Sequence, residues 1–153
     1  MQALLQRVSK ASVKVDEKTV GRIGQGLVTF IGVGPEDVEE DAAYLADKIA
    51  GLRIFSDEEG KLNLSLQDIG GEVLVVSQFT LMATTRKGRR PSFNQAAPPE
   101  MAEPLVEKFS GFIRQAGVQV ETGQFQAHMM VEIHNDGPVT ISIDSQDRFK
   151  PRK

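Results

Sequence analysis

The first third of the chain is patterned like β-strands. Ala11, Val13 and Val15 alternate with polar neighbours, which is the period of a strand with one buried face. Residues 27–33, LVTFIGV, are almost all apolar, as in a strand that is buried on both faces. Together with the run at 20–26, these segments predict three strands.

Two later stretches have the spacing of amphipathic helices. In the first, Pro35 stands at a suitable first helical position, acidic residues follow it, and apolar residues recur every three or four positions. These apolar residues are Val38, Ala42, Leu45, Ile49 and Leu52. The pattern predicts a helix from about Pro35 to Leu52. A second helix is expected to open at Pro98 and stop at Gly117, with an apolar face formed by Leu105, Phe109, Phe112 and Ile113.

The remaining apolar runs predict further strands. The longest, residues 73–81, is rich in β-branched side chains and becomes polar at Ser77. The others lie at residues 53–56, 63–67, 118–121, 127–134 and 138–144. Strands and helices neither repeat nor alternate strictly, so this order favours an α+β fold with two main helices packed on mixed and antiparallel sheets.

Residues 134–140, HNDGPVT, raise a separate question. Asp136-Gly137 between two strand-like runs is a strong hairpin signal, because both central positions of a type I′ turn favour a positive φ. A proline directly after the glycine is not required by such a turn and removes a backbone donor from the returning strand. The local pattern predicts a chain reversal here and leaves the role of Pro138 open.

Composition places the chain among ordinary globular proteins. It is 40% hydrophobic and 25% charged over 153 residues, which predicts one domain, residues 1–153, with a substantial core. The first residues alternate where a signal peptide would be continuously apolar, and no run of about 18 apolar residues occurs, so a soluble, cytoplasmic protein is expected. The absence of cysteine excludes disulfides, thiol nucleophiles and thiolate metal sites.

Charge is unevenly distributed. The formal net charge of -3 argues against a protein that coats nucleic acid indiscriminately. Positive residues gather at 85–91, TRKGRRP, and in the tail at 148–153. Such a run is usually a solvated loop, but it could also hold phosphates at one end of a nucleic acid. Composition alone leaves both interpretations open.

Candidate nucleophiles and metal ligands are few. Ser77 and Thr80 carry hydroxyl groups, but no G-x-S-x-G elbow or Ser-His-Asp set accompanies them, so both are expected to bond backbone or substrate. The two histidines, His128 and His134, are interpreted as ordinary strand residues, because no third metal ligand lies nearby in the sequence. The glycines at 21–26 are interpreted as turn residues, since the phosphate-loop ending is missing.

Several segments resemble those of the D-aminoacyl-tRNA deacylase family, whose members hydrolyse the ester between a D-amino acid and tRNA. Both signature motifs of that family are present, SQFTL at 77–81 and NDGPVT at 135–140. Other matching segments, spread over the whole chain, are residues 6–9, 20–24, 52–55, 63–65 and 86–93. Gln126 departs from the family pattern, because a glycine is usual at that position, and this puts the local turn in question.

The resemblance implies a homodimer with two active sites at the subunit interface. It further implies a cis Gly137-Pro138 peptide bond that reaches into the partner's pocket at Ser77–Thr80. A rigid backbone element next to the α-carbon of the substrate would collide with an L side chain and leave room for a D side chain. Glycine has no side chain, so glycyl-tRNA is a plausible second substrate of such a site.

The resemblance also implies roles for the other site residues. The main chain of Phe79 and Thr80 would bind the ester or the amino group, Ser77 and Gln78 would orient the terminal adenosine, and Phe125 would pack near its base. The acceptor-stem phosphates would be held by Arg86, Lys87, Arg89 and Arg90. No cofactor, metal or membrane is implied. Two alternatives remain: a non-catalytic RNA-binding module, and a hydrolase of another ester that uses Thr80 as nucleophile.

Overall fold

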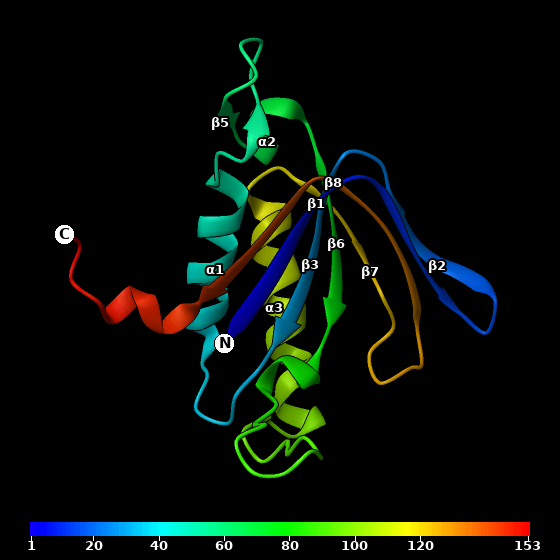
Figure 1. The fold of residues 1–153 in the computed structure, drawn as a ribbon, viewed down its shortest axis with the longest axis vertical. Helices are drawn as coiled ribbons and strands as arrows, with labels where there is room; N and C mark the ends of the chain where they lie inside the picture. The colour runs from blue at the N-terminus through cyan, green and yellow to red at the C-terminus, as the bar shows by residue number, and fades with distance from the viewer.

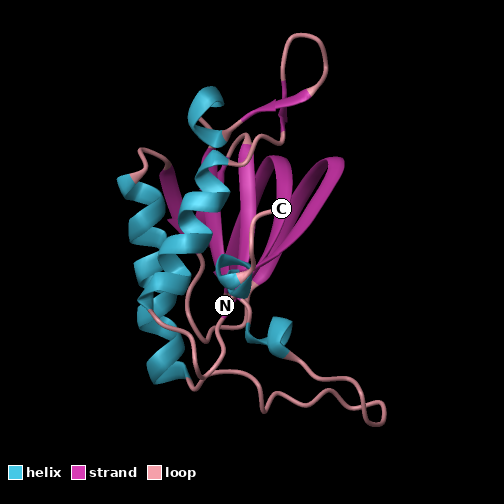
Figure 2. Cartoon of the chain, turned by 90° about the vertical axis from the view of Figure 1, so that its left-hand side faces the viewer, coloured by secondary structure: helices cyan, strands magenta, loops and turns pink.

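The computed structural model describes all 153 residues and consists of a six-stranded sheet with two long helices on one face (Figures 1 and 2). The strands of this sheet are β1 (Gln2–Val15), β2 (Lys18–Ile23), β3 (Gly26–Gly32), β6 (Glu72–Ser77), β7 (Gln119–Thr122) and β8 (Met130–Asp144). The pairs β3–β6 and β6–β7 are parallel, and the other pairs are antiparallel. The predicted α+β class and mixed sheet are confirmed.

Strand β1 organises the sheet. Its first half pairs with β3, its second half pairs with β2, and β8 runs along almost its whole length. The sheet curls until it is nearly closed, and a Cβ on Gly21 of β2 would lie only 2.8 Å from the Thr122 carbonyl oxygen of β7. At Gly26 a Cβ would lie 1.8 Å from the Glu72 carbonyl oxygen, so only glycine permits the approach of β3 to β6.

The two long helices are α1 (Glu39–Gly51) and α3 (Pro99–Gln115). They pack on each other and on the sheet, and their apolar faces enclose the larger of two hydrophobic cores. Helix α1 begins later than the predicted Pro35, because Asp37 forms a turn in which its carboxylate accepts the Gly34 N–H at 2.6 Å. Helix α3 ends before Gly117, which has a φ of 85°, as the sequence predicts.

Two predicted strands end earlier than expected. The strand predicted at 63–67 is only β5 (Leu62–Leu64), paired with β4 (Phe55–Ser56), because Ser65 caps the short helix α2 (Leu66–Ile69). The Ser65 hydroxyl accepts the Asp68 N–H at 3.2 Å, and the Asp68 carboxylate accepts the Ser65 N–H at 2.8 Å. The strand predicted at 73–81 ends at Ser77, where the chain bends into the 3-10 helix η1 (Phe79–Met82).

The predicted hairpin at 134–140 is wrong. Strand β8 continues through this segment, and both of its halves run antiparallel to β1, so the chain does not reverse. The pairs Gln6–Thr140 and Val8–Asn135 flank one residue of β1 but four residues of β8. Residues 136–139 therefore form a bulge, here called the Gly-Pro bulge. The Gly137-Pro138 peptide bond within it is cis, as the resemblance implies.

Hydrogen bonds hold the Gly-Pro bulge against β1. The Arg7 side chain donates from Nε to the Asp136 carbonyl at 3.1 Å and from a terminal nitrogen to the Ile54 carbonyl at 2.8 Å. The Asn135 side chain accepts the Val139 N–H at 3.3 Å. The bonds to the Asp136 carbonyl and from the Val139 N–H replace ladder bonds that the bulge interrupts.

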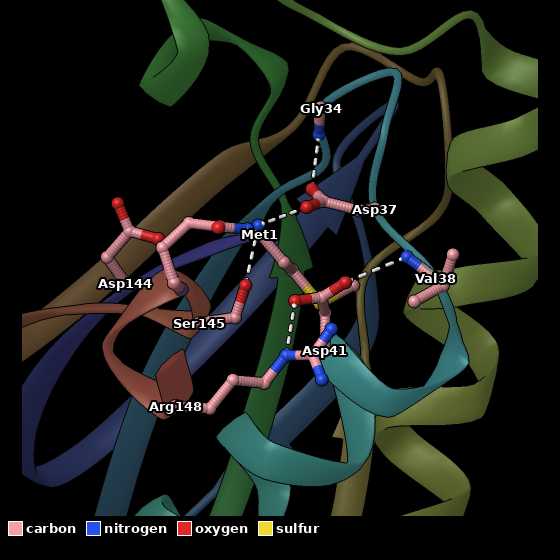
Figure 3. A network of polar contacts seen from close by, with 9 residues as sticks. Met1, Gly34, Asp37, Val38, Asp41, Asp144, Ser145 and Arg148 are labelled. Carbon is pink, nitrogen blue, oxygen red and sulfur yellow. Dashed lines mark hydrogen bonds and ion pairs between the residues drawn. The ribbon is translucent and has the colours of Figure 1, made fainter. Parts of the chain in front are cut away.

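A polar network ties the two ends of the chain to α1 (Figure 3). The α-ammonium of Met1 is buried and donates to Asp37 Oδ1 at 2.6 Å and to Ser145 Oγ at 2.9 Å. Ser145 opens the 3-10 helix η2 (Ser145–Phe149), which also supplies Arg148, whose Nε lies 3.2 Å from Asp41 Oδ1. Two buried carboxylates are thus balanced by two cations. None of the helices combines the length and the apolar character that a membrane span requires.

Candidate active site

Four of the predicted site residues meet in one pocket at the carboxyl end of β6. Ser77, Gln78 and Phe79 come from the end of this strand and the start of η1, and Phe125 comes from the loop between β7 and β8. The pocket, here called the main pocket, has a volume of about 660 Å³. Most of its other lining residues are apolar, which suits an organic substrate held by a few polar groups.

The chain leaves two backbone donors unpaired beside the main pocket. The Gln78 amide donates to the Ile31 carbonyl at 2.8 Å and fixes the end of β6 against β3. The next two amides, those of Phe79 and Thr80, begin η1 and have no partner in the chain, and no side chain caps this turn. They are therefore available to a carbonyl oxygen of a ligand.

Thr80 has no base within reach. Its hydroxyl accepts a hydrogen bond from Gln78 Nε2, and its side chain lies outside the lining of the main pocket. A nucleophilic hydroxyl needs a neighbouring group that removes its proton. The NH2 group of a glutamine side chain only donates hydrogen bonds and cannot do so. In this geometry the Thr80 hydroxyl is an acceptor for Gln78, and no hydrogen bond joins it to a base.

The turn that carries Phe125 forms despite the departure at Gln126. The Ala127 N–H donates to the Gln124 carbonyl at 3.2 Å, and Gln126 has a φ of 62°. This φ lies in the left-handed region, which glycine adopts without steric cost. The conformation therefore explains why glycine is suited to this position. Gln126 itself lines the main pocket.

Two further lining residues were missed in the sequence. Phe93 follows the basic run, and its ring centroid lies 5.0 Å from that of Phe79 in an edge-to-face arrangement. His128 lies in the loop before β8 and also lines the main pocket. Both come from segments far from the SQFTL motif, and their only sequence signals are an aromatic residue next to a basic run and a histidine near Phe125.

The two histidines do not share a strand face as expected. His128 precedes β8, whereas His134 lies within β8 and bonds Glu132 Oε1 through Nε2 at 3.0 Å. That hydrogen bond holds the pKa of Glu132 below its ordinary value. The interpretation as ordinary strand residues therefore applies to His134 and is wrong for His128.

A second hollow, here called the side pocket, adjoins the main pocket and shares Ser77 and Phe125 with it. It has a volume of about 450 Å³ and is bordered by polar residues of α3, among them Glu107 and Arg114. Ser110, also on its border, is buried, and its hydroxyl has no hydrogen-bond partner. The two pockets together extend the hollow from η1 to the middle of α3.

The four basic residues lie apart from the main pocket on an exposed loop. This loop, residues 84–92, is closed at its base by two backbone hydrogen bonds between Thr84 and Ser92, of 2.8 and 2.9 Å. The loop lies at the lower end of the molecule in Figure 1, beyond η1. Its tip carries Arg86, Lys87, Arg89 and Arg90, none of which forms an ion pair.

Gly137 and Pro138 lie outside the main pocket of their own chain. Both are exposed on the Gly-Pro bulge, which faces β1 near Arg7, and neither borders the main pocket or the side pocket. The predicted site residues therefore form three separate groups in one chain: the pocket group from β6 to Phe125, the basic tip of the 84–92 loop, and the exposed bulge.

Two solved structures share this fold over nearly the whole chain. One, named "c-Myc DNA Unwinding Element Binding Protein", is 39% identical, with a TM-score of 0.88 over 94% of this chain and 98% of that one. Another, described as a probable eukaryotic D-amino acid tRNA deacylase, shares the fold at 21% identity, with a TM-score of 0.81 over the same shares of the two chains.

Sequence comparison identifies the family. The model of the D-Tyr-tRNA(Tyr) deacylase family matches residues 4–144, and the chain belongs to this family. A D-aminoacyl-tRNA deacylase of Dehalococcoides mccartyi is 62% identical over 99% of both chains. Another, of Thermotoga petrophila, is 59% identical over 97% of this chain and all of its own. The resemblance noted in the two signature motifs is thus confirmed over nearly the whole chain.

Proposed function

We propose that the chain is a D-aminoacyl-tRNA deacylase, which hydrolyses the ester between a D-amino acid and the 3′ end of tRNA. The observation that carries this proposal is the pair of unpaired amides, Phe79 and Thr80, beside a pocket lined by Ser77, Gln78 and Phe125. Family membership and the names of the relatives support it.

The chemistry is assigned to main-chain groups and water. The amides of Phe79 and Thr80 bind the ester carbonyl or the substrate's amino group, and a water attacks the carbonyl carbon. The bond between the carbonyl carbon and the ribose oxygen then breaks, and that oxygen receives the proton that the attacking water gives up, which yields the tRNA hydroxyl and the free D-amino acid. An aminoacyl ester is already activated by the adjacent ribose hydroxyl, so a side-chain nucleophile is not required.

The rest of the tRNA end is assigned to the surrounding residues. Ser77 and Gln78 orient the terminal adenosine, and Phe125 packs near its base, since all three line the main pocket. Acceptor-stem phosphates bind the tip of the 84–92 loop, where Arg86, Lys87, Arg89 and Arg90 have no acidic partner.

Selection against L-amino acids is assigned to a second copy of the chain. Gly137 and Pro138 are exposed and lie outside the pockets of their own chain, which supports a role in the pocket of a partner subunit. In such a homodimer the backbone of the Gly-Pro bulge excludes an L side chain by collision and tolerates any D side chain. Glycine has no side chain that could collide with the Gly-Pro bulge, so glycyl-tRNA is a second substrate of the same site.

A non-catalytic nucleic-acid-binding module is the main competing function. The basic loop favours it, and so does the 39% identical structure, because that protein is named for binding a DNA element. In that case the Gly-Pro bulge has only a structural role. A hydrolase that uses the Thr80 hydroxyl on another ester is a third possibility, and a D-selective, tRNA-dependent activity would exclude it.

Purified protein with D-tyrosyl-tRNA, and L-tyrosyl-tRNA as the matched control, tests the proposed function. Release of D-tyrosine with L-tyrosyl-tRNA left intact is the expected result. A difference in kcat/KM of about a hundredfold or more is expected, because a collision that costs about 3 kcal/mol in the transition state has that effect. Binding of both substrates without release from either would favour the binding module.

A further inference from the structure

We propose that Phe93 forms a stacking platform for the unpaired base that precedes the terminal nucleotide of the tRNA. This inference rests on the proposed function and assigns a positioning role to a residue outside the signature motifs. The platform consists of the Phe93 ring and the Phe79 ring that packs against it.

The exposure of the two rings carries the proposal. Phe79 is 56% exposed and Phe93 is 39% exposed, although both border the main pocket. The two rings meet edge to face, with a centroid distance of 5.0 Å and an interplanar angle of 68°, while both residues stay exposed. Each ring fixes the orientation of the other, so the pair is preorganised for a flat ligand.

The position of Phe93 between two tRNA-binding regions indicates which part of the RNA it meets. On one side, Phe93 directly follows the base of the loop whose tip carries the four unpaired cations. On the other side, its ring borders the main pocket, which is assigned to the terminal adenosine. A strand that runs from the cations to the pocket passes Phe93 just before its last nucleotide.

The chemistry of an unpaired base suits this surface. Single-stranded bases have apolar faces that are commonly stacked on aromatic side chains, and this stacking tolerates any base. The adjacent cations attract the phosphates that flank such a base. A stacked base would also bury ring area that is otherwise exposed to water.

A fluorescence measurement tests the stacking directly. The probe is an RNA hairpin that carries no amino acid and has a single-stranded 3′ end with 2-aminopurine in the penultimate position. Stacking of 2-aminopurine on an aromatic ring changes its fluorescence emission. Wild-type protein and Phe93→Tyr are expected to change the emission on binding, and Phe93→Ala is expected to leave it unchanged at saturation. Phe149→Ala serves as the control, because Phe149 is 65% exposed and lies outside the main pocket. A wild-type emission change that persists in Phe93→Ala overturns the proposal.

Kinetics separate this role from a general effect on the pocket. Phe93→Ala is expected to raise KM for D-tyrosyl-tRNA about tenfold, in line with the loss of one stacked base, with kcat within about twofold of wild type. With 3′-O-D-tyrosyl-adenosine, which lacks the preceding base, the rise in KM is expected to be clearly smaller, because only the lining of the main pocket is then altered. An equal loss on both substrates, or a changed sedimentation coefficient that shows Phe93 at a subunit contact, overturns the proposal. If wild type hydrolyses neither substrate, the proposed function fails, and the fluorescence signal still decides the role of Phe93.

Discussion

At the scale of single residues, removal of the Thr80 hydroxyl distinguishes main-chain catalysis from nucleophilic catalysis. It accepts a hydrogen bond from Gln78 and has no base beside it. Thr80→Ala is therefore expected to lower kcat for D-tyrosyl-tRNA by less than about tenfold, whereas loss of a true nucleophile costs about 10⁴-fold or more. Single-turnover hydrolysis measures the difference.

Thr85→Ala is the matched control for this change. Thr85 is an exposed threonine a few residues farther along the chain and borders neither pocket. If Thr80→Ala abolishes hydrolysis while tRNA binding and the melting temperature stay as in Thr85→Ala, Thr80 is the nucleophile and main-chain catalysis is wrong.

Residue-level prediction from the sequence succeeds where a motif is continuous. Ser77, Gln78 and Phe79 follow one another at a strand end, so their shared pocket follows from the pattern of a strand that becomes polar. Phe93 and His128 reach the same pocket from two other segments, and no local rule states that these segments meet. Their contribution depends on tertiary packing, which spacing along the chain does not encode.

At the scale of elements, the 84–92 loop is predicted to supply most of the salt dependence of tRNA binding. Each cation that contacts a phosphate adds about 0.7 to 0.9 to the slope of log K against log salt. Replacing Arg86, Lys87, Arg89 and Arg90 together with alanine is expected to reduce this slope by roughly 3 and to weaken binding at low salt. Filter binding across a salt series measures it.

Lys61→Ala is the control, because this lysine is also exposed but lies on the β4–β5 hairpin at the opposite end of the molecule (Figure 1). An unchanged slope in the quadruple variant, or an equal change in Lys61→Ala, would show that the loop is only a solvated surface segment.

The observed bounds of strands and helices show where tertiary contacts outweigh local sequence preferences. The Asp136-Gly137 pair has the composition of a hairpin turn, yet both flanking runs pair with the same strand, β1, so the direction of β8 is kept. Pairing with β1 along nearly its whole length outweighs a local turn preference. The two long helices were predicted well because their apolar spacing is long and regular, and their main difference from the prediction is the later start of α1, since Asp37 is used in the terminal network.

At the scale of the whole molecule, the network around Asp41 links α1 to the end of the chain. Burial alone would raise the pKa of Asp41, but hydrogen bonds from the Val38 amide and the Ser145 hydroxyl, together with the nearby Arg148 and Met1 charges, hold it below its ordinary value of 3.8. Ionised Asp41 therefore stabilises the fold fully above that pH, and its contribution is lost as the pH falls through the lower pKa of the folded state.

Asp41→Asn is expected to lower the free energy of unfolding by about 2 kcal/mol at pH 7, and Tm by roughly 4–8 °C. At pH 2.5 the difference from wild type should shrink, because below pH 3.8 the carboxyl of the unfolded wild-type chain binds a proton and the stabilisation by ionised Asp41 decreases. Urea unfolding at both pH values measures this. Asp47→Asn, on the exposed side of α1, is the control and should change little at either pH. A loss that is equally large at both pH values would contradict the role of the charge.

The assembly itself is tested by mixing two variants. The bulge variant carries Gly137→Ala with Pro138→Gly, and the pocket variant carries Gln78→Ala with Phe79→Ala. The bulge variant alone is expected to hydrolyse L-tyrosyl-tRNA as well as D-tyrosyl-tRNA, because nothing then collides with an L side chain. If each site combines the main pocket of one subunit with the Gly-Pro bulge of the other, an excess of the pocket variant places an intact bulge at each intact pocket. Hydrolysis of L-tyrosyl-tRNA should then fall while hydrolysis of D-tyrosyl-tRNA persists. L-tyrosyl-tRNA hydrolysis that stays unchanged, with mixed dimers demonstrated by mass spectrometry, would contradict a site shared between subunits.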